Sequence, residues 1–268
     1  MEPLLNNLRK DIRMQKESDR QMSTAWILVY IIPFIVSLVI AAYFTVTLLD
    51  VFSSIDFSDP QSYNYSYDWL PAEFVSVWLM TLLMGAANCV VTIFLNYLLV
   101  NRRATHFKRQ KFLSEDIIST IDYLAKTKDI SVDVNLSSLQ RTLREANYEE
   151  TEKSAILWSI LSAFVPFIQL YVYYFLVKDF YRHEHREDGF WVDASGALNT
   201  LGVNFSVPQR IKPMPYRSFV LYLILSIVTA GMFAVYWLYV LVKDPNEHFK
   251  AHIQAETQLL TALESVTV

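Results

Sequence analysis

The chain contains, at residues 77–100, the stretch VWLMTLLMGAANCVVTIFLNYLLV, which has no Asp, Glu, Lys, Arg or His. A helix needs about 20 apolar residues to cross the hydrocarbon core of a bilayer. A soluble protein would instead disperse its apolar residues with the periodicity of a helix or strand, because each element needs a polar face. The stretch therefore predicts a membrane-spanning α-helix.

Three further uncharged apolar runs occur at residues 24–49, 155–177 and 219–242. Lipid offers the backbone no hydrogen-bond partner, so a segment that crosses it as a single chain must be helical. We therefore predict an all-α, multi-pass protein of the cell membrane. It should have about four hydrophobic segments and the lipid bilayer as a partner.

Composition excludes several classes of function. The formal charge of −4 does not fit a nucleic-acid-binding protein, which usually has a basic face. The single cysteine, Cys89, excludes an intramolecular disulfide, a Cys-rich metal site and a redox pair. The sequence has no Gly-rich phosphate loop, no GxSxG and no paired carboxylates in an apolar site. We predict no enzyme activity, no catalytic residue and no bound cofactor.

Basic residues predict the orientation. The arm before the first run has five, the segment 51–76 has none, and residues 101–154 have ten. The positive-inside rule then places the N-terminus and residues 101–154 in the cytoplasm, with the loop 51–76 outside. The sequon at Asn64 is compatible with that outer loop. Four full spans would return the C-terminus to the cytoplasm.

The loop 178–216 conflicts with this count. Four full crossings would place it outside, yet it carries Arg182, Arg186, Arg210 and Lys212. The alternative is that the third run folds back as a hairpin at Pro166. Each run contains a residue that weakens a helix, namely Pro33, Gly85, Pro166 and Gly231. These residues predict either kinks or broken, re-entrant helices, and we favour four simple spans.

An internal repeat follows three of the runs. The runs end in Tyr-x-x-Val at residues 97–100, 174–177 and 239–242, and a His comes nine residues after each Tyr. The unit recurs either as a tandem duplication of two-span halves or as a threefold single-span repeat. A shared exit motif favours the threefold grouping and also the hairpin, because such a motif should face one compartment.

The first grouping divides the chain into halves, 1–133 and 134–268. The first half would contain an amphipathic arm at 2–22, the span 24–49, the outer loop 51–76, the span 77–100 and a cytoplasmic helix that begins at Ser114. The second half would contain a helix at 137–153 opened by Ser137, the segment 155–177, the loop 178–216, the span 219–242 and a tail helix at 245–263 with Pro245 in its first turn.

Histidines raise the question of a metal site. His248 and His252 share a helix face, and His183-x-His185 lies among Glu184, Glu187 and Asp188. These spacings suit a divalent metal, but no HExxH or thiolate frame accompanies them. We therefore predict no metal ligands. The preferred interpretation is that each repeated His complements the dipole at the cytoplasmic end of a span.

Other polar groups have simple interpretations. We expect the acidic residues Glu145, Glu149, Glu150 and Glu152 to form a solvated helix face. Four polar residues inside the runs should form hydrogen bonds between helices, or else line a pore; they are Asn88, Asn96, Gln169 and Thr229.

The fourth run resembles a known family. It reads LSIVTAG at residues 225–231 and YWLY at 236–239. This resembles an uncharacterised prokaryotic membrane-domain family whose span reads Leu-Ser-x-x-Thr-x-Gly followed by Tyr-Trp-x-Tyr. The resemblance covers residues 217–265. It implies a bacterial or archaeal source and a helical membrane fold, with no activity to carry over.

The sequence favours a non-enzymatic membrane scaffold or interaction protein. Its amphipathic helices would supply contact surfaces for a second copy or for another membrane protein. The alternative is a small channel, a transporter subunit or a lipid-binding module that uses the broken helices.

Overall fold

Helix α4 (Leu70–Lys128) joins an apolar run to a polar segment without a break. Residues 101–113 contain neither Gly nor Pro, so nothing in the backbone interrupts the helix after the run. The prediction that a separate helix begins at Ser114 is therefore wrong. The same helix carries both the apolar stretch and the first repeated histidine, His106.

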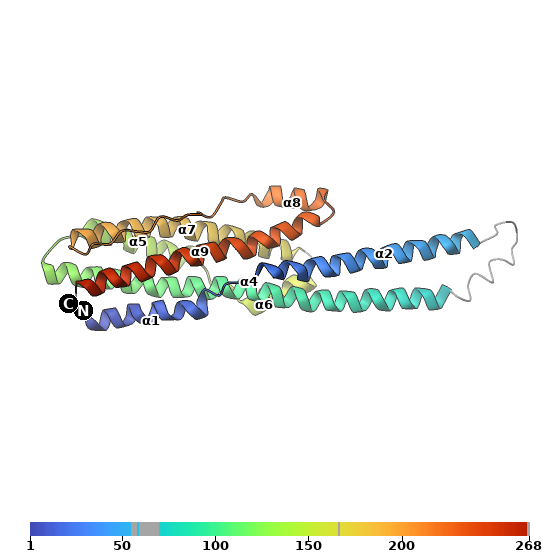
Figure 1. Ribbon diagram of the computed structural model, residues 1–268, viewed down its shortest axis with the longest axis horizontal. Helices are drawn as coiled ribbons and strands as arrows, with labels where there is room; N and C mark the ends of the chain where they lie inside the picture. The colour runs from blue at the N-terminus through green and yellow to red at the C-terminus, as the bar shows by residue number, and fades with distance from the viewer. Residues whose placement is uncertain (55–57, 59–69, 166, 267–268) are drawn as a thin grey trace. The chain divides into compact units, whose positions relative to one another are not determined.

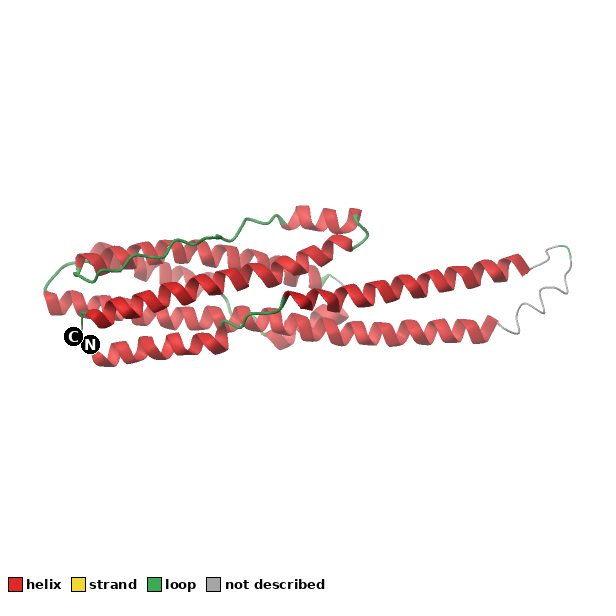
Figure 2. Ribbon diagram, in the orientation of Figure 1, coloured by secondary structure: helices red, strands yellow, loops and turns green. Residues whose placement is uncertain are grey.

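A computed structural model describes residues 1–54, 58, 70–165 and 167–266 (Figure 1). The described part is helical throughout apart from its connections, which confirms the all-α class (Figure 2). The other elements are α1 (Glu2–Ser18), the short 3₁₀ helix η1 (Thr24–Ile27), α2 (Leu28–Ser54), α5 (Asp133–Glu149), α6 (Ala155–Phe164), α7 (Ile168–Thr200), α8 (Phe219–Val228) and α9 (Met232–Ser265). Most of the predicted outer loop, including Asn64, and Pro166 itself lie outside the described residues.

The chain divides into two units. One comprises Met1–Thr24 and Asn96–Val268, and the other comprises Ala25–Leu95. This division does not follow the two predicted halves, which remain a prediction. The candidate site described below lies wholly within the first unit.

The described residues of the unit Ala25–Leu95 expose many apolar side chains. Leu38, Val39, Leu83 and Val90 are between 55% and 68% exposed. Two helices of the described chain are long and apolar enough to cross a membrane, Thr24–Asp50 and Val75–Lys128. The predicted spans 24–49 and 77–100 fall within them.

The third and fourth runs each form two helices rather than one. The third ends α6 at Phe164 and resumes as α7, and Trp158 lies 5.7 Å from Phe175 between ring centroids. The fourth ends α8 at Val228 and resumes as α9, and Phe219 lies 5.5 Å from Trp237. Such contacts bring residues on either side of each break together, so each pair is a helical hairpin. Four long spans are not confirmed.

The break in the fourth run has a clear backbone cause. Gly231 has φ +89° and Ala230 has φ +49°, which are left-handed conformations that end a helix. The Gly231 N–H donates to the carbonyl of Ser226 at 2.7 Å, so the turn satisfies a carbonyl that α8 leaves free.

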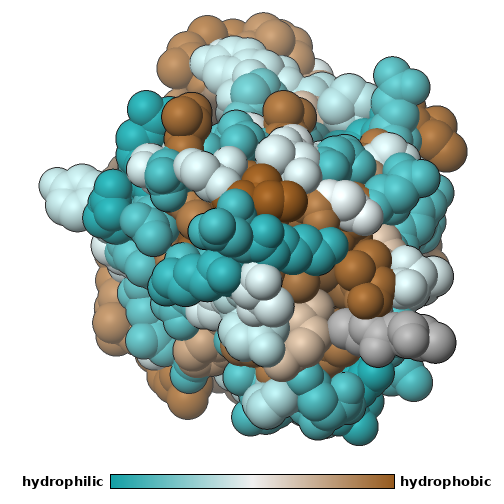
Figure 3. Space-filling model, turned by 90° about the vertical axis from the view of Figure 1, so that its left-hand side faces the viewer, coloured by the Kyte–Doolittle hydropathy of each residue, from teal (hydrophilic) through white to brown (hydrophobic). Residues whose placement is uncertain are grey.

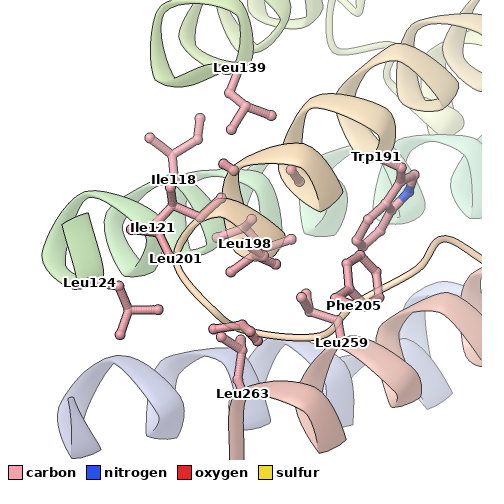
Figure 4. Close-up of a cluster of buried hydrophobic side chains, with 14 of the residues drawn as sticks. Ile118, Ile121, Leu124, Leu139, Trp191, Leu198, Leu201, Phe205, Leu259 and Leu263 are labelled. Carbon is pink, nitrogen blue, oxygen red and sulfur yellow. The ribbon is translucent and has the colours of Figure 1, made fainter. Parts of the chain in front are cut away.

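A hydrophobic core lies at the end of the first unit that contains both termini (Figures 1 and 4). It is built from α1, α4, α5, α7, α9 and the connector after α7, and its members include Leu8, Ile121, Leu139, Leu198, Phe205 and Leu263. The tail residues Leu259 and Leu263 are 0% and 1% exposed, so the tail helix packs on its own chain. Around this core the surface at the same end is mostly hydrophilic (Figure 3).

Several predicted boundaries are wrong. The helix expected at 137–153 runs from Asp133 to Glu149, so the expected cap Ser137 lies inside it. The hydroxyl of the next residue, Ser138, donates to Asp193 at 2.6 Å. The helix does not continue into the third run. The loop expected at 178–216 is helical to Thr200, and only the connector between α7 and α8 is extended.

The tail helix also begins earlier than expected. Pro245 lies inside α9 instead of in the first turn of a new helix. Proline has no N–H, so the carbonyl of Leu241 loses its helical donor. Arg102, which is 3% exposed, donates to that carbonyl from α4. The uninterrupted helix thus depends on a partner that is far away in the sequence.

Candidate metal centre

Three long helices each bring polar side chains to one buried place. His106 comes from α4, His183 and Glu187 come from α7, and His248 and His252 come from α9. The two pairs have a spacing of four residues, which places both members on one helix face. All five residues are buried, with exposures between 0% and 9%.

The ligand-type atoms of these residues converge. One atom from each of the five lies within 4.8 Å of every other. His106 Nε2 lies 3.2 Å from His183 Nε2 and 3.2 Å from His248 Nε2. Two nitrogens bound to one ion at about 2.1 Å are separated by a similar distance. We call these five residues the His₄Glu cluster.

Glu187 contributes both of its carboxylate oxygens. Oε1 lies 3.0 Å from His183 Nε2, while Oε2 lies 2.7 Å from His252 Nε2 and 3.6 Å from His248 Nε2. The carboxylate therefore faces the ring of imidazole nitrogens with both oxygens.

Each histidine uses its other nitrogen to bind a polar partner. Three Nδ1 atoms lie 2.7–2.8 Å from a carboxylate oxygen: His106 beside Asp19, His183 beside Glu150 and His248 beside Glu184. His252 Nδ1 lies 2.7 Å from the Gln110 amide and 3.4 Å from Glu256. Carboxylates bound to the outer nitrogen fix the ring orientation and the tautomer, as they do around protein-bound metals.

Arginines hold these outer carboxylates. Arg109 donates to Asp19 at 2.7 Å and to Glu256 at 2.9 Å. Arg210, from the connector, donates to Glu184 at 3.1 Å, and Arg186 donates to Glu150. Five buried carboxylates (Asp19, Glu150, Glu184, Glu187 and Glu256) face three guanidinium groups. With neutral imidazoles the assembly therefore carries two net negative charges.

The carboxylates make the cluster attractive to positive charge. Burial alone would lower the pKa of His183, but Glu187 and Glu150 outweigh it and raise that pKa to about 9. Burial prevails at His248, where the pKa falls to about 4. Burial would raise the pKa of Glu187, yet the charges of His183 and His252 hold it well below its usual value. A metal ion would replace the protons that such histidines otherwise hold.

An aromatic layer lies beside the cluster. Phe107, Phe180 and Phe249 are at most 2% exposed and pack together with Met214. The rings of Phe107 and His183 are stacked with centroids 4.2 Å apart. This aromatic layer packs against the imidazole rings and excludes water from that side of the cluster.

The structure revises the interpretation of the histidines. His106, His183 and His248 lie inside long helices and do not stand at helix ends, so they do not cap a helix dipole. His185 is exposed and lies against Tyr181, outside the cluster. Glu150 is buried against His183 and does not belong to a solvated helix face.

No metal ligand was predicted, but part of the cluster follows a pattern that is visible in the sequence. The three histidines that follow the Tyr-x-x-Val motifs are three members of the cluster. His252 lies one helical turn beyond the third of them, and Glu187 lies one turn beyond the second. The repeat itself remains a prediction, but its three histidines lie together in the structure.

The cluster also bears on the four-span interpretation. Four full crossings would place His183 and His106 on opposite sides of a bilayer about 30 Å thick. Their Nε2 atoms are 3.2 Å apart. The break of the third run into α6 and α7 agrees with the hairpin alternative, and the number of crossings remains a prediction.

The polar residues of the runs lie apart from the cluster. Asn96 donates to Ser162 at 2.6 Å and to Gln169 at 2.5 Å, which is the predicted hydrogen bonding between helices. Thr229 bonds within its own turn, to the Leu225 carbonyl. Asn88 lines an apolar groove of about 540 Å³ in the unit Ala25–Leu95.

Comparisons with known proteins reach only one segment. Residues 217–268 match the model of a domain of unknown function, DUF4234. This position agrees with the resemblance seen in the fourth run, and the segment includes α8, α9 and the cluster residues His248 and His252. No curated protein and no solved structure matches the chain.

Proposed function

We propose that the chain is a membrane-anchored metal-binding protein whose His₄Glu cluster holds one divalent transition-metal ion. The observation that carries this proposal is the convergence of five buried ligand atoms within 4.8 Å of one another, from three different helices. Buried histidines that were merely structural would need partners for both ring nitrogens. Here His106 Nε2 faces only other histidines among the contacts described.

The surrounding charge supports a divalent ion. Two net negative charges remain on the buried assembly when its imidazoles are neutral, and a divalent cation would neutralise them. Without the metal, protons on histidines such as His183 would balance this charge, and the ion would replace them. Imidazole-rich sites suit transition metals and do not suit Mg²⁺ or Ca²⁺, which prefer oxygen ligands.

The ion would join α4, α7 and α9. These helices are far apart in the sequence, and one ion bound to all three would fix their rotation and register. The helices Thr24–Asp50 and Val75–Lys128 would anchor this bundle in the cell membrane. A scaffold role without enzyme activity remains a prediction, but the buried face of α9 cannot serve as its contact surface.

Metal analysis of the purified protein tests the proposal. The full chain, extracted in a mild detergent, should contain one transition-metal ion per chain by inductively coupled plasma mass spectrometry. His183→Ala should lose it, because one ligand disappears. His185→Ala is the matched control on the same helix and should retain it. Metal-free wild-type protein that also fails to bind added metal would refute the proposal.

A further inference from the structure

The coordination that the cluster offers leads one step further, on the premise that the proposed function is correct. We infer that the centre is a closed, six-donor site for an octahedral first-row ion of the Fe²⁺ class, and is not a tetrahedral zinc site. The inference rests on the number and direction of the donor atoms.

Four imidazole nitrogens and two carboxylate oxygens point into the same space. Nε2 of each histidine faces the cluster, because Nδ1 is bound to an outer partner. The two oxygens of Glu187 lie beside different histidines, Oε1 by His183 and Oε2 by His252. A carboxylate that faces its neighbours with both oxygens is arranged to bind an ion with both.

Six protein donors select among metals by geometry. Structural zinc is nearly always bound by four ligands in a tetrahedron, so this set would leave two buried donors outside its coordination shell. Ions that accept six nitrogen and oxygen donors would use all of them, and imidazole ligands favour Fe²⁺, Co²⁺ and Ni²⁺ over Mn²⁺ or Mg²⁺. The sequence provides no thiolate, since Cys89 lies in the other unit.

The same count closes the site to substrates. Catalytic metals keep a position for water or substrate, whereas structural sites are filled by protein. Here the five ligands are at most 9% exposed. Arg210, from the connector between α7 and α8, also packs against the cluster. Its Nη2 lies 3.5 Å from Glu187 Oε2 and its Nη1 lies 3.1 Å from Glu184 Oε2. The ion would therefore hold the helices together and would not activate a water molecule.

Cobalt substitution tests the geometry. Purified full-length protein in detergent is stripped of metal and then loaded with Co²⁺ under anaerobic conditions. Its visible absorption spectrum is then recorded. Six-coordinate Co²⁺ absorbs weakly, while four-coordinate Co²⁺ absorbs intensely. We expect the weak spectrum, unchanged by added azide, and a first shell of six light atoms in X-ray absorption.

Variants separate the donors. In Glu187→Gln one carboxylate oxygen becomes an amide nitrogen, so Co²⁺ should still bind but with more intense visible bands as its coordination number falls. Glu115→Gln, exposed on α4, is the control and should give the wild-type spectrum. The wild-type spectrum decides the matter even if the Glu187 variant fails to fold.

The outcomes distinguish the two proposals. An intense four-coordinate spectrum, or a new band with azide, would overturn the closed six-donor site while leaving a metal-binding function in place. Failure of the wild-type protein to take up any Co²⁺, Fe²⁺ or Zn²⁺ would overturn both.

Discussion

Arg109 shows how a single residue controls the buried charge. It is 1% exposed and binds the carboxylates of Asp19 and Glu256 together. Asp19 in turn lies 2.8 Å from His106 Nδ1, and Glu256 lies 3.4 Å from His252 Nδ1. Because the arginine neutralises two buried acids that come from different ends of the chain, its contribution is electrostatic as well as steric.

Replacing Arg109 with Met should destabilise the protein strongly. The methionine fills much of the volume but leaves two carboxylates buried without a cation, which costs about 3–5 kcal/mol. Thermal unfolding in detergent measures the change. Arg141→Met removes an arginine whose side chain is 69% exposed and should leave the melting temperature nearly unchanged. An equal effect of the two substitutions would contradict the role assigned to Arg109.

Asp11 should make stability depend on pH. Burial, with a hydrogen bond to Asp116, raises the pKa of this α1 carboxyl to about 6. Charges facing it are Asp116 and Arg109 on α4 and Lys10 on α1. A folded-state pKa above the unfolded value favours the protonated form. The contribution of protonated Asp11 to the stability of the fold is therefore complete below about pH 4 and is lost as the pH rises through 6.

The variant Asp11→Asn tests this dependence. Asn stays neutral and can still donate to Asp116, so the variant should melt several degrees higher than the wild type at about pH 7.5 and only slightly higher at about pH 4. Melting curves at both pH values measure the difference. A gap that is the same at both, or larger in acid, would mean that Asp11 does not titrate in this range.

At the scale of elements, the breaks in the apolar runs decide the architecture. The fourth run looks continuous in hydropathy, but its backbone turns at residues 230–231. The hairpin α8–α9 then places Tyr222 against Phe233, with centroids 5.1 Å apart. The turn starts α9 at Met232, and this helix then carries His248 and His252 of the cluster and Leu259 and Leu263 of the hydrophobic core.

Gly231→Ala tests the hairpin directly. A side chain in the left-handed region costs about 1–2 kcal/mol, so the variant should be less stable than the wild type. Gly189→Ala is the matched control, since Gly189 lies inside α7 with nothing within 4 Å of an added Cβ. That substitution should stabilise the protein by about 0.5–1 kcal/mol. A stabilising Gly231→Ala would indicate a continuous helix there.

At the scale of the whole molecule, the cluster requires that the C-terminal parts of α4, α7 and α9 share one compartment. We therefore expect the hairpins α6–α7 and α8–α9 to enter and leave a membrane on the same side, or to lie beside it, whereas the apolar part of α4 would cross it. The 178–216 segment, whose basic residues conflicted with four crossings, would then obey the positive-inside rule together with residues 101–154.

Cysteine labelling should show this arrangement. In a Cys89→Ser background, Val134→Cys on α5 and Val192→Cys on α7 place thiols at positions that are 84% and 67% exposed. A membrane-impermeant maleimide should label both in permeabilised cells and neither in intact ones. Labelling of position 192 alone in intact cells would restore the four-span topology and remove the basis for the cluster.

Part of this fold could be predicted from local sequence. The uncharged runs, the helical class, the arm α1 and the recurrence of a histidine after each exit motif depend on neighbouring residues, because hydropathy and helix propensity act over short distances. The breaks were visible as Pro166 and Gly231, but residues of these types also occur in kinked, continuous membrane helices.

The convergence of the side chains of the candidate metal centre depended on the tertiary structure. His106 and His248 are separated by 142 positions, and their Nε2 atoms meet only because α4 and α9 pack with one particular rotation and register. The same packing buries Glu150, which was expected on a solvated helix face, and aligns the Leu241 carbonyl with Arg102. The sequence by itself therefore determined which segments avoid water. Their tertiary packing decided which polar groups meet, because a long-range contact depends on the positions of all the elements between its partners.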